Sequence, residues 1–78
     1  MNYEIASLED LRFDIEVYIE KDGNKYAVVL AKKYERETFT SHFCSIEEAY
    51  AVFEKLSKAI VFGLYSWEDR LKILKGDL

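Results

Sequence analysis

Residues 37–56 read ETFTSHFCSIEEAYAVFEKL, and the hydrophobic period changes within them at Ser45. Before Ser45 the apolar residues recur at every second position, which is the period of a half-buried strand. After it they recur every three or four positions, which is the period of an amphipathic helix. Ser45 is a favourable N-cap, and Glu48 completes the spacing of a capping box. The segment therefore predicts a sheet that ends where a helix begins.

Two further strands are expected upstream. Apolar and polar residues alternate over 12–20, with Phe13, Ile15, Val17 and Ile19 on the apolar side. Asp22-Gly23 is a hairpin signal, and either a two-residue or a four-residue loop would set Glu20 opposite Lys25. An even-length turn at Tyr34-Glu35 would then place Phe39 of a third strand, residues 37–44, opposite Leu30. These strands predict an antiparallel meander.

Downstream, one apolar stripe defines a long helix: Ile46, Ala49, Tyr50, Phe53, Leu56, Ile60, Gly63 and Leu64. A short final helix is expected from Ser66 to Gly76, and it is the expected cover for Phe62 and Tyr65, which lie off the stripe. Ser7-Leu8-Glu9-Asp10 predicts one capped turn of helix before the first strand. The expected fold is a single α+β domain over residues 1–78, with three strands packed on a long and a short helix.

Composition limits the classes of function. Half of the 78 residues are hydrophobic, which predicts a folded chain of one domain. The single cysteine, Cys44, excludes an internal disulfide and favours a reducing compartment, so we expect a cytoplasmic protein. No apolar run is long enough for a signal peptide or a membrane span, and we expect neither secretion by that route nor membrane insertion.

Charge argues against nucleic acid as a direct partner. The net charge is −4, and polyanion binding depends on cations that contact phosphates. Residues 1–20 hold six carboxylates and one cation, Arg12, whereas residues 21–36 are mainly basic. Adjacent strands of opposite sign would neutralise each other across a sheet. The alternative is an acidic edge that faces a basic partner.

No motif predicts catalysis. His42 and Cys44 would share a strand face, as a cysteine nucleophile and its base require, but nothing nearby supplies an oxyanion hole. Further metal ligands are not apparent around them. Asp14 and Glu16 would also share a face, and a solvated strand explains them better than a carboxylate pair in a sugar cleft. We therefore expect no enzyme, no cofactor and no metal, and an enzyme using Cys44 and His42 is the weaker alternative.

The face of the sheet opposite the helices is the better candidate site. Helices that all follow the third strand can cover only one face, and a bare patch of tyrosine with small apolar residues suits a protein contact. The predicted protein-binding residues are Asp14, Glu16, Tyr18, Glu20, Ala27, Val29, Thr38, Thr40 and His42. A homodimer is the alternative, formed through the bare sheet face or through the third strand, which is an edge with few charges and is also open to strand addition. The partner's identity is not encoded in any motif.

Two resemblances concern form. A short helix, three strands and a helix is also the order of the double-stranded RNA-binding domain, but its phosphate-binding lysines correspond here to Ser45-Ile46-Glu47-Glu48, so RNA binding is not expected. In size, acidity and layout the chain resembles small phage or mobile-element proteins that inhibit host machinery, including some anti-CRISPR proteins. That resemblance implies an acidic surface that occupies a nucleic-acid channel, with the carboxylates between Glu4 and Glu20 as its site.

Overall fold

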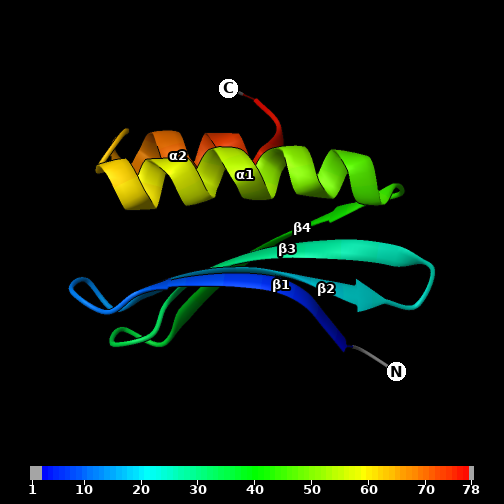
Figure 1. The fold of residues 1–78 in the computed structure, drawn as a ribbon, viewed down its shortest axis with the longest axis horizontal. Coiled ribbons are helices and arrows are strands. Elements are labelled where there is room, and N and C mark those ends of the chain that lie inside the picture. Colours follow the sequence, from blue (N-terminus) through cyan, green and yellow to red (C-terminus); the bar gives the residue numbers. More distant parts are fainter. Residues whose placement is uncertain (1–2, 78) are drawn as a thin grey trace.

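The computed structural model describes residues 3–77, which form a four-stranded antiparallel sheet with two helices on one of its faces (Figure 1). The strands follow one another in the order of the chain, as expected for a meander. They and the helices are β1 (Tyr3–Asp10), β2 (Ile15–Asp22), β3 (Lys25–Lys32), β4 (Glu37–Phe43), α1 (Ile46–Phe62) and α2 (Trp67–Lys75). The α+β class is confirmed, but the sheet has four strands and not three.

The core lies between the sheet and the helices. Alternate side chains of β2 and β3 point at the helices and are completely buried, as Val17, Ile19, Val28 and Leu30 show. The helices contribute buried residues from the opposite side, namely Ala49, Leu56, Ala59, Ile60, Ile73 and Leu74. This is the two-layer solution that amphipathic strands and helices require, and the alternation of β2 and β3 predicts it correctly.

The extra strand, β1, occupies the segment for which the sequence predicts a turn of helix. Its pairing with β2 is interrupted by a bulge between Glu4 and Ala6. A bulge inserts one residue and so breaks the two-residue alternation. As a result Ile5 and Leu8, three residues apart, both pack on the core. That spacing is typical of a helix, which is why the strand is not recognisable from its period.

The hairpin between β2 and β3 has a different register from the expected one. Asp22 pairs with Lys25 and Lys21 with Tyr26, so Glu20 faces Ala27 and not Lys25. The loop is Gly23-Asn24, and the positive φ of 62° at Gly23 is the requirement of a type II′ turn. This register puts the Lys21 ammonium 4.3 Å from the centre of the Tyr26 ring. The shift is of two residues, so every side chain stays on the predicted face.

The turn between β3 and β4 agrees with the sequence. Leu30 pairs with Phe39 and Lys32 with Glu37, as an even-length turn around Tyr34-Glu35 requires. Phe39 then makes an edge-to-face contact with Trp67 of α2, with 5.9 Å between ring centres. The register of this hairpin therefore determines where the second helix docks.

Both helices begin at the expected N-caps, and α2 ends at Gly76 as expected, whereas α1 ends earlier than its apolar stripe predicts. The Ser45 hydroxyl accepts a hydrogen bond from the Glu48 N–H at 3.2 Å, and Ser66 caps α2 in the same way through the Asp69 N–H. Gly63 ends α1 in the left-handed conformation, where glycine has no steric penalty. Leu64, expected in the helical stripe, lies beyond this end and is exposed.

Phe62 and Tyr65 are not covered by α2, contrary to expectation. Their exposed fractions are 69% and 46%. The chain turns at Gly63 so that α2 runs back over the sheet, where Ile73 and Leu74 enter the core. Because the buried side of α2 faces the sheet, the connection between the helices is left in solvent with its aromatic residues.

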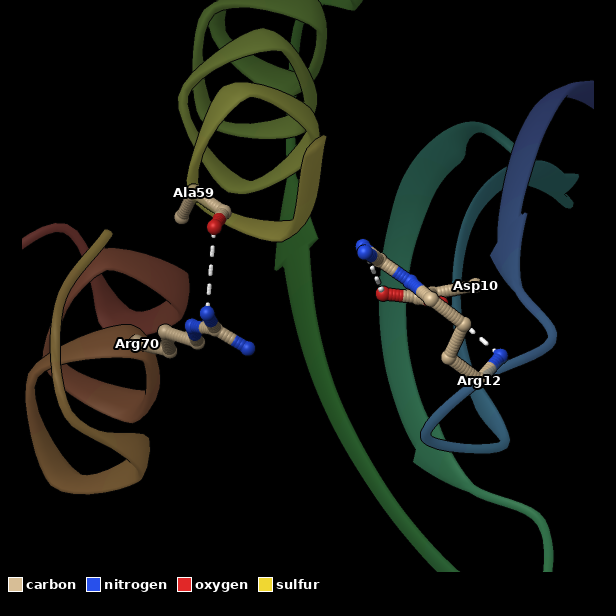
Figure 2. A network of polar contacts seen from close by, with 4 residues as sticks. All are labelled: Asp10, Arg12, Ala59 and Arg70. Carbon is tan, nitrogen blue, oxygen red and sulfur yellow. Dashed lines mark hydrogen bonds and ion pairs between the residues drawn. The ribbon is translucent and has the colours of Figure 1, made fainter. Parts of the chain in front are cut away.

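Arg70 holds the corner between the helices. Its guanidinium donates a hydrogen bond to the carbonyl of Ala59 at 3.0 Å (Figure 2). It also donates two hydrogen bonds to the carbonyl of Leu64, at 2.9 and 3.1 Å. The last turn of α1 contains no basic residue of its own. Arg70 of α2 therefore supplies both the donors and the positive charge that the C-terminus of α1 needs.

The turn between β1 and β2 is organised by Asp10, which is only 9% exposed. Its carboxylate accepts hydrogen bonds from the backbone N–H and the side chain of Arg12 at 3.0 to 3.2 Å (Figure 2). These hydrogen bonds from Arg12 lower the pKa of Asp10 below its usual range. Phe13 belongs to this turn, and its ring is 66% exposed. The alternation of the sequence predicts Phe13 in the core, and that prediction is wrong.

We expect Arg70→Gln to lower the free energy of unfolding by about 1–2 kcal/mol, because the last carbonyls of α1 lose charged donors. Chemical denaturation followed by circular dichroism would measure it. Arg36→Gln is the matched control, since that side chain is exposed and forms no hydrogen bond or ion pair within residues 3–77. Equal stability of the two variants would contradict the role of Arg70.

We expect Asp10→Asn to destabilise the domain at neutral pH. The pKa of Asp10 is lower in the folded state than in the unfolded state. Its carboxylate therefore stabilises the fold at pH values above the pKa of the unfolded state, and this stabilisation is lost as pH falls through the pKa of the folded state. The difference between wild type and variant should therefore shrink below about pH 4. Denaturation midpoints measured at several acidic pH values would show this change. In an Arg12→Gln background, Asp10→Asn should cost less stability, because the side-chain donor to the Asp10 carboxylate is already gone.

Candidate protein-binding surface

The candidate site is the outer sheet face, which is the face of the sheet turned away from the helices (Figure 1). The pairing of the strands assigns its side chains: Glu4, Ser7 and Glu9 of β1, Glu16, Tyr18 and Glu20 of β2, Ala27, Val29 and Ala31 of β3, and Thr38, Thr40 and His42 of β4. Both α1 and α2 lie against the opposite face. The prediction that the helices leave this face bare is confirmed for the described part of the chain.

The small residues of β3 lie on this face but are not exposed, contrary to expectation. Val29 is 4% exposed, and Ala27 and Ala31 are buried as well. Each small side chain stands between larger ones on the neighbouring strands, as Val29 does between Tyr18 and Thr40. Contact with another molecule would therefore be made mainly by the taller side chains of β2 and β4.

Carboxylates are paired with carboxylates on this face. Glu4 lies directly opposite Glu20, and Glu9 directly opposite Glu16, on the antiparallel strands β1 and β2. Side chains opposite each other in such a pair are about 5 Å apart at Cβ, and like charges there are destabilising. The outer sheet face thus carries two pairs of like charge. Replacing one glutamate of each pair with a basic residue would give an attractive pair instead.

Only part of this charge is neutralised. Lys33 forms an ion pair with Glu9 at 2.8 Å, and a hydrogen bond from the ammonium to that carboxylate raises the pKa of Lys33. Among residues 3–77, Glu4, Glu16 and Glu20 have no ion pair. The expectation that adjacent strands of opposite sign neutralise each other is therefore wrong for Glu16 and Glu20. On one side β3 places Ala31 and Ala27 opposite them, and on the other side β1 places further carboxylates.

Tyr18 lies in the middle of the acidic residues. It pairs with Ser7 of β1 and Val29 of β3, in the row between the two glutamate pairs. Burial raises the pKa of its hydroxyl, and the negative charges of Glu20, Glu16 and Glu4 raise the pKa further. The ring is therefore a neutral, partly buried side chain surrounded by negative charge.

Most of the predicted site residues are brought together, and Asp14 is not. Glu16, Tyr18, Glu20, Ala27, Val29, Thr38, Thr40 and His42 share the outer sheet face. Asp14 lies in the turn before β2, with a φ of 54°, so it does not share a strand face with Glu16. Glu4 and Glu9 were not predicted on this sheet face, although the inhibitor resemblance includes them among the carboxylates of an acidic surface. The alternation of Ser7-Leu8-Glu9 is the signal that could have placed Glu9 there.

The edges of the sheet differ from the expected ones. The segment predicted as the first edge strand is β2, which is paired on both sides. The outer strands are β1 and β4, so the uncharged run of β4 keeps its place at an edge. The described chain thus retains the predicted site for strand addition at β4 and has a second edge at β1.

In the part of the chain that the structure describes, no hydrogen bond joins His42 and Cys44. His42 Nε2 lies 3.2 Å from Asp22 Oδ2, and Cys44 is exposed just after β4 ends. Within residues 3–77 no group of three or more histidine, cysteine or acidic residues could hold a metal ion. Neither α1 nor α2 is long and apolar enough to cross a membrane.

We expect Glu16→Gln with Glu20→Gln to lower the pKa of Tyr18, without returning it fully to 10 because burial also raises it. Because the pKa of Tyr18 is raised in the folded state, the free energy of unfolding should fall as pH rises from about 10 through the pKa of the folded state. The double variant should lose less stability over that range. Ultraviolet absorbance titrations, each compared with its Tyr18→Phe version, would measure this. An unchanged Tyr18 titration would show that these carboxylates do not act on it.

Comparison of the chain with protein-family models, with curated proteins and with solved structures gives no significant match.

Proposed function

We propose that this protein is a non-enzymatic protein-binding module whose outer sheet face binds a basic surface of another protein. The observation that carries the proposal is the pairing of Glu4 with Glu20 and of Glu9 with Glu16. These pairs oppose folding, and the core does not need them, because they lie on the face away from the helices. Lys33 already offsets Glu9 in one of the pairs, so a cationic partner would gain most at Glu4, Glu16 and Glu20, which have no ion pair within residues 3–77.

The composition of the face supports a protein as the partner. Tyr18 offers an aromatic side chain at its centre, and tyrosine is enriched in protein interfaces because it provides both apolar area and a hydroxyl. Thr38 and Thr40 add small side chains on the neighbouring edge. Glu16 and Glu20 lie about 13 Å apart along β2, so a partner would meet charge on both sides of the tyrosine.

The inhibitor form of this proposal specifies the partner as a protein with a cationic groove for nucleic acid. Carboxylates held on a sheet can occupy such a groove and so exclude the phosphates that it normally binds. The unneutralised Glu4, Glu16 and Glu20 support this form. Its specific consequence is competition: the module and nucleic acid would not bind the partner together.

A homodimer through the edge of β4 is the second candidate. Thr38-Phe39-Thr40-Ser41 offers an edge with no charged side chain. A dimer formed by two outer sheet faces is less favourable, since a two-fold contact would bring the glutamates of both copies together. Light scattering over a concentration series would identify a dimer, and Thr40→Lys should dissociate one built on β4.

We expect Glu16→Gln with Glu20→Gln to weaken partner binding while leaving stability equal or higher by about 0.5 kcal/mol, because repulsion on the face is relieved. Wild type and variant would be immobilised, and proteins retained from a lysate of the source cells would be compared by mass spectrometry at several salt concentrations. A true partner should be lost from the variant and should bind less at high salt.

Glu54→Gln with Glu68→Gln is the matched control, because it removes the same charge from the exposed sides of α1 and α2. It should retain the partner that the sheet-face variant loses. Retention of the same proteins by both variants would contradict the proposal. If the inhibitor form is correct, added nucleic acid should release the partner from the immobilised wild-type protein. A complex that contains the protein, the partner and nucleic acid together would exclude the inhibitor form.

A further inference from the structure

A second surface lies on the helix side of the sheet, at the end of the molecule where α1 and α2 meet. A hollow of about 390 Å³ opens between the turn that precedes β2 and the start of α2. Its walls include the aromatic side chains of Phe13, Tyr65 and Trp67 and the cations Lys32 and Arg70. We call it the aromatic groove. It is independent of the outer sheet face, because these residues belong to turns, to α2 and to the inner face.

The groove lacks acidic residues, although the protein as a whole is acidic. None of the residues that line it is Asp or Glu, whereas the neighbouring hollow of about 340 Å³ includes Glu9 and Asp10. Arg70 uses its hydrogen bonds on neutral carbonyls and so retains its positive charge in the groove. The local field therefore favours a negatively charged group on whatever enters.

The ion pair of the Lys32 ammonium indicates that this cation binds a carboxylate. It lies 4.2 Å from the centre of the Trp67 ring, and its carboxylate partner is Glu35, at 3.7 Å. The Glu35 side chain is largely exposed, so this ion pair is a weak one that another carboxylate could replace. A carboxylate in that place would be next to the ring of Trp67.

Tyr65 lies in the short connection between α1 and α2, at a backbone position that disfavours its side chain. Its φ is 66°, in the left-handed region that a bulky side chain rarely adopts, and glycine or asparagine would be less strained there. Its ring is half exposed beside the groove. The strained connection thus places an aromatic ring at the groove.

From these observations we propose that the aromatic groove binds a segment of another protein in which a bulky apolar side chain stands next to a carboxylate. The apolar side chain would lie among Phe13, Tyr65 and Trp67, and the carboxylate would take the place of Glu35 on Lys32. Such a contact would leave the outer sheet face free. The protein would then join two partners, one at each surface.

The probe is an acetylated and amidated nonapeptide with Leu-Phe between two glutamates in a Gly-Ser background, and its twin has lysine in place of glutamate. Trp67 is the only tryptophan, so its fluorescence and its indole N–H signal in NMR report on the groove directly. We expect the acidic peptide to shift both signals in a saturable way, and the basic twin to shift them at least about fivefold less strongly at equal concentration.

Three substitutions separate the proposed contacts. Lys32→Gln should lower the affinity for the acidic peptide about threefold to tenfold. Glu35→Gln should raise that affinity about twofold to fivefold, because it removes the carboxylate that competes for Lys32. Tyr65→Asn should abolish the response and leave the thermal midpoint equal or higher, because asparagine relieves the left-handed strain. Arg36→Asn is its matched control, because Arg36 also has a left-handed φ, 56°, but does not line the groove.

The proposal is overturned by any of four results. These are an equal response to both peptides, no response to either, weaker binding in Glu35→Gln, or a Trp67 signal that changes with the concentration of the protein alone. The last would show that a second copy of this chain fills the groove. None of these results depends on the outer sheet face, so failure here leaves the proposed function intact.

Discussion

Burial of the inner side chains of β2 and β3 beneath α1 is the interaction on which the rest of the structure depends. Val17, Ile19, Val28 and Leu30 meet Leu56 and its neighbours in the only large core of the described chain. A chain of 78 residues has apolar side chains for one such core. Both helices are therefore used on one side of the sheet, and the other side is free from any requirement to pack.

That division explains which features could be predicted from the sequence. Side-chain direction in a strand depends on position being odd or even, so the alternation in β2 and β3 assigned the two faces correctly. Register depends on turn geometry, and the choice of Gly23-Asn24 for the loop moved the pairing by two residues without changing a face. Caps carry their signal in a few adjacent residues, and both N-caps were predicted.

The features that were missed depend on contacts that are distant in sequence. The bulge at the start of β1 hid a strand, and with it the glutamates that face Glu16 and Glu20. The acidic character of the outer sheet face was foreseen from β2 alone, but its like-charge pairs depend on which strand lies alongside. In the same way, nothing local indicated that α2 would turn toward the sheet and leave Tyr65 beside a groove. The two proposed surfaces therefore arise from tertiary structure, and local motifs did not reveal them.

Within residues 3–77, the three non-glycine residues with left-handed backbone have a common location. Asp14 lies between β1 and β2, Arg36 between β3 and β4, and Tyr65 between α1 and α2. Two hairpin turns and the helix connection all occupy one end of the domain (Figure 1). Local opening releases such strain, which costs on the order of 1 kcal/mol or more per residue. Amide hydrogens at that end should consequently exchange with solvent sooner than those beside Gly23 and Ser45, which makes this end the more adjustable of the two.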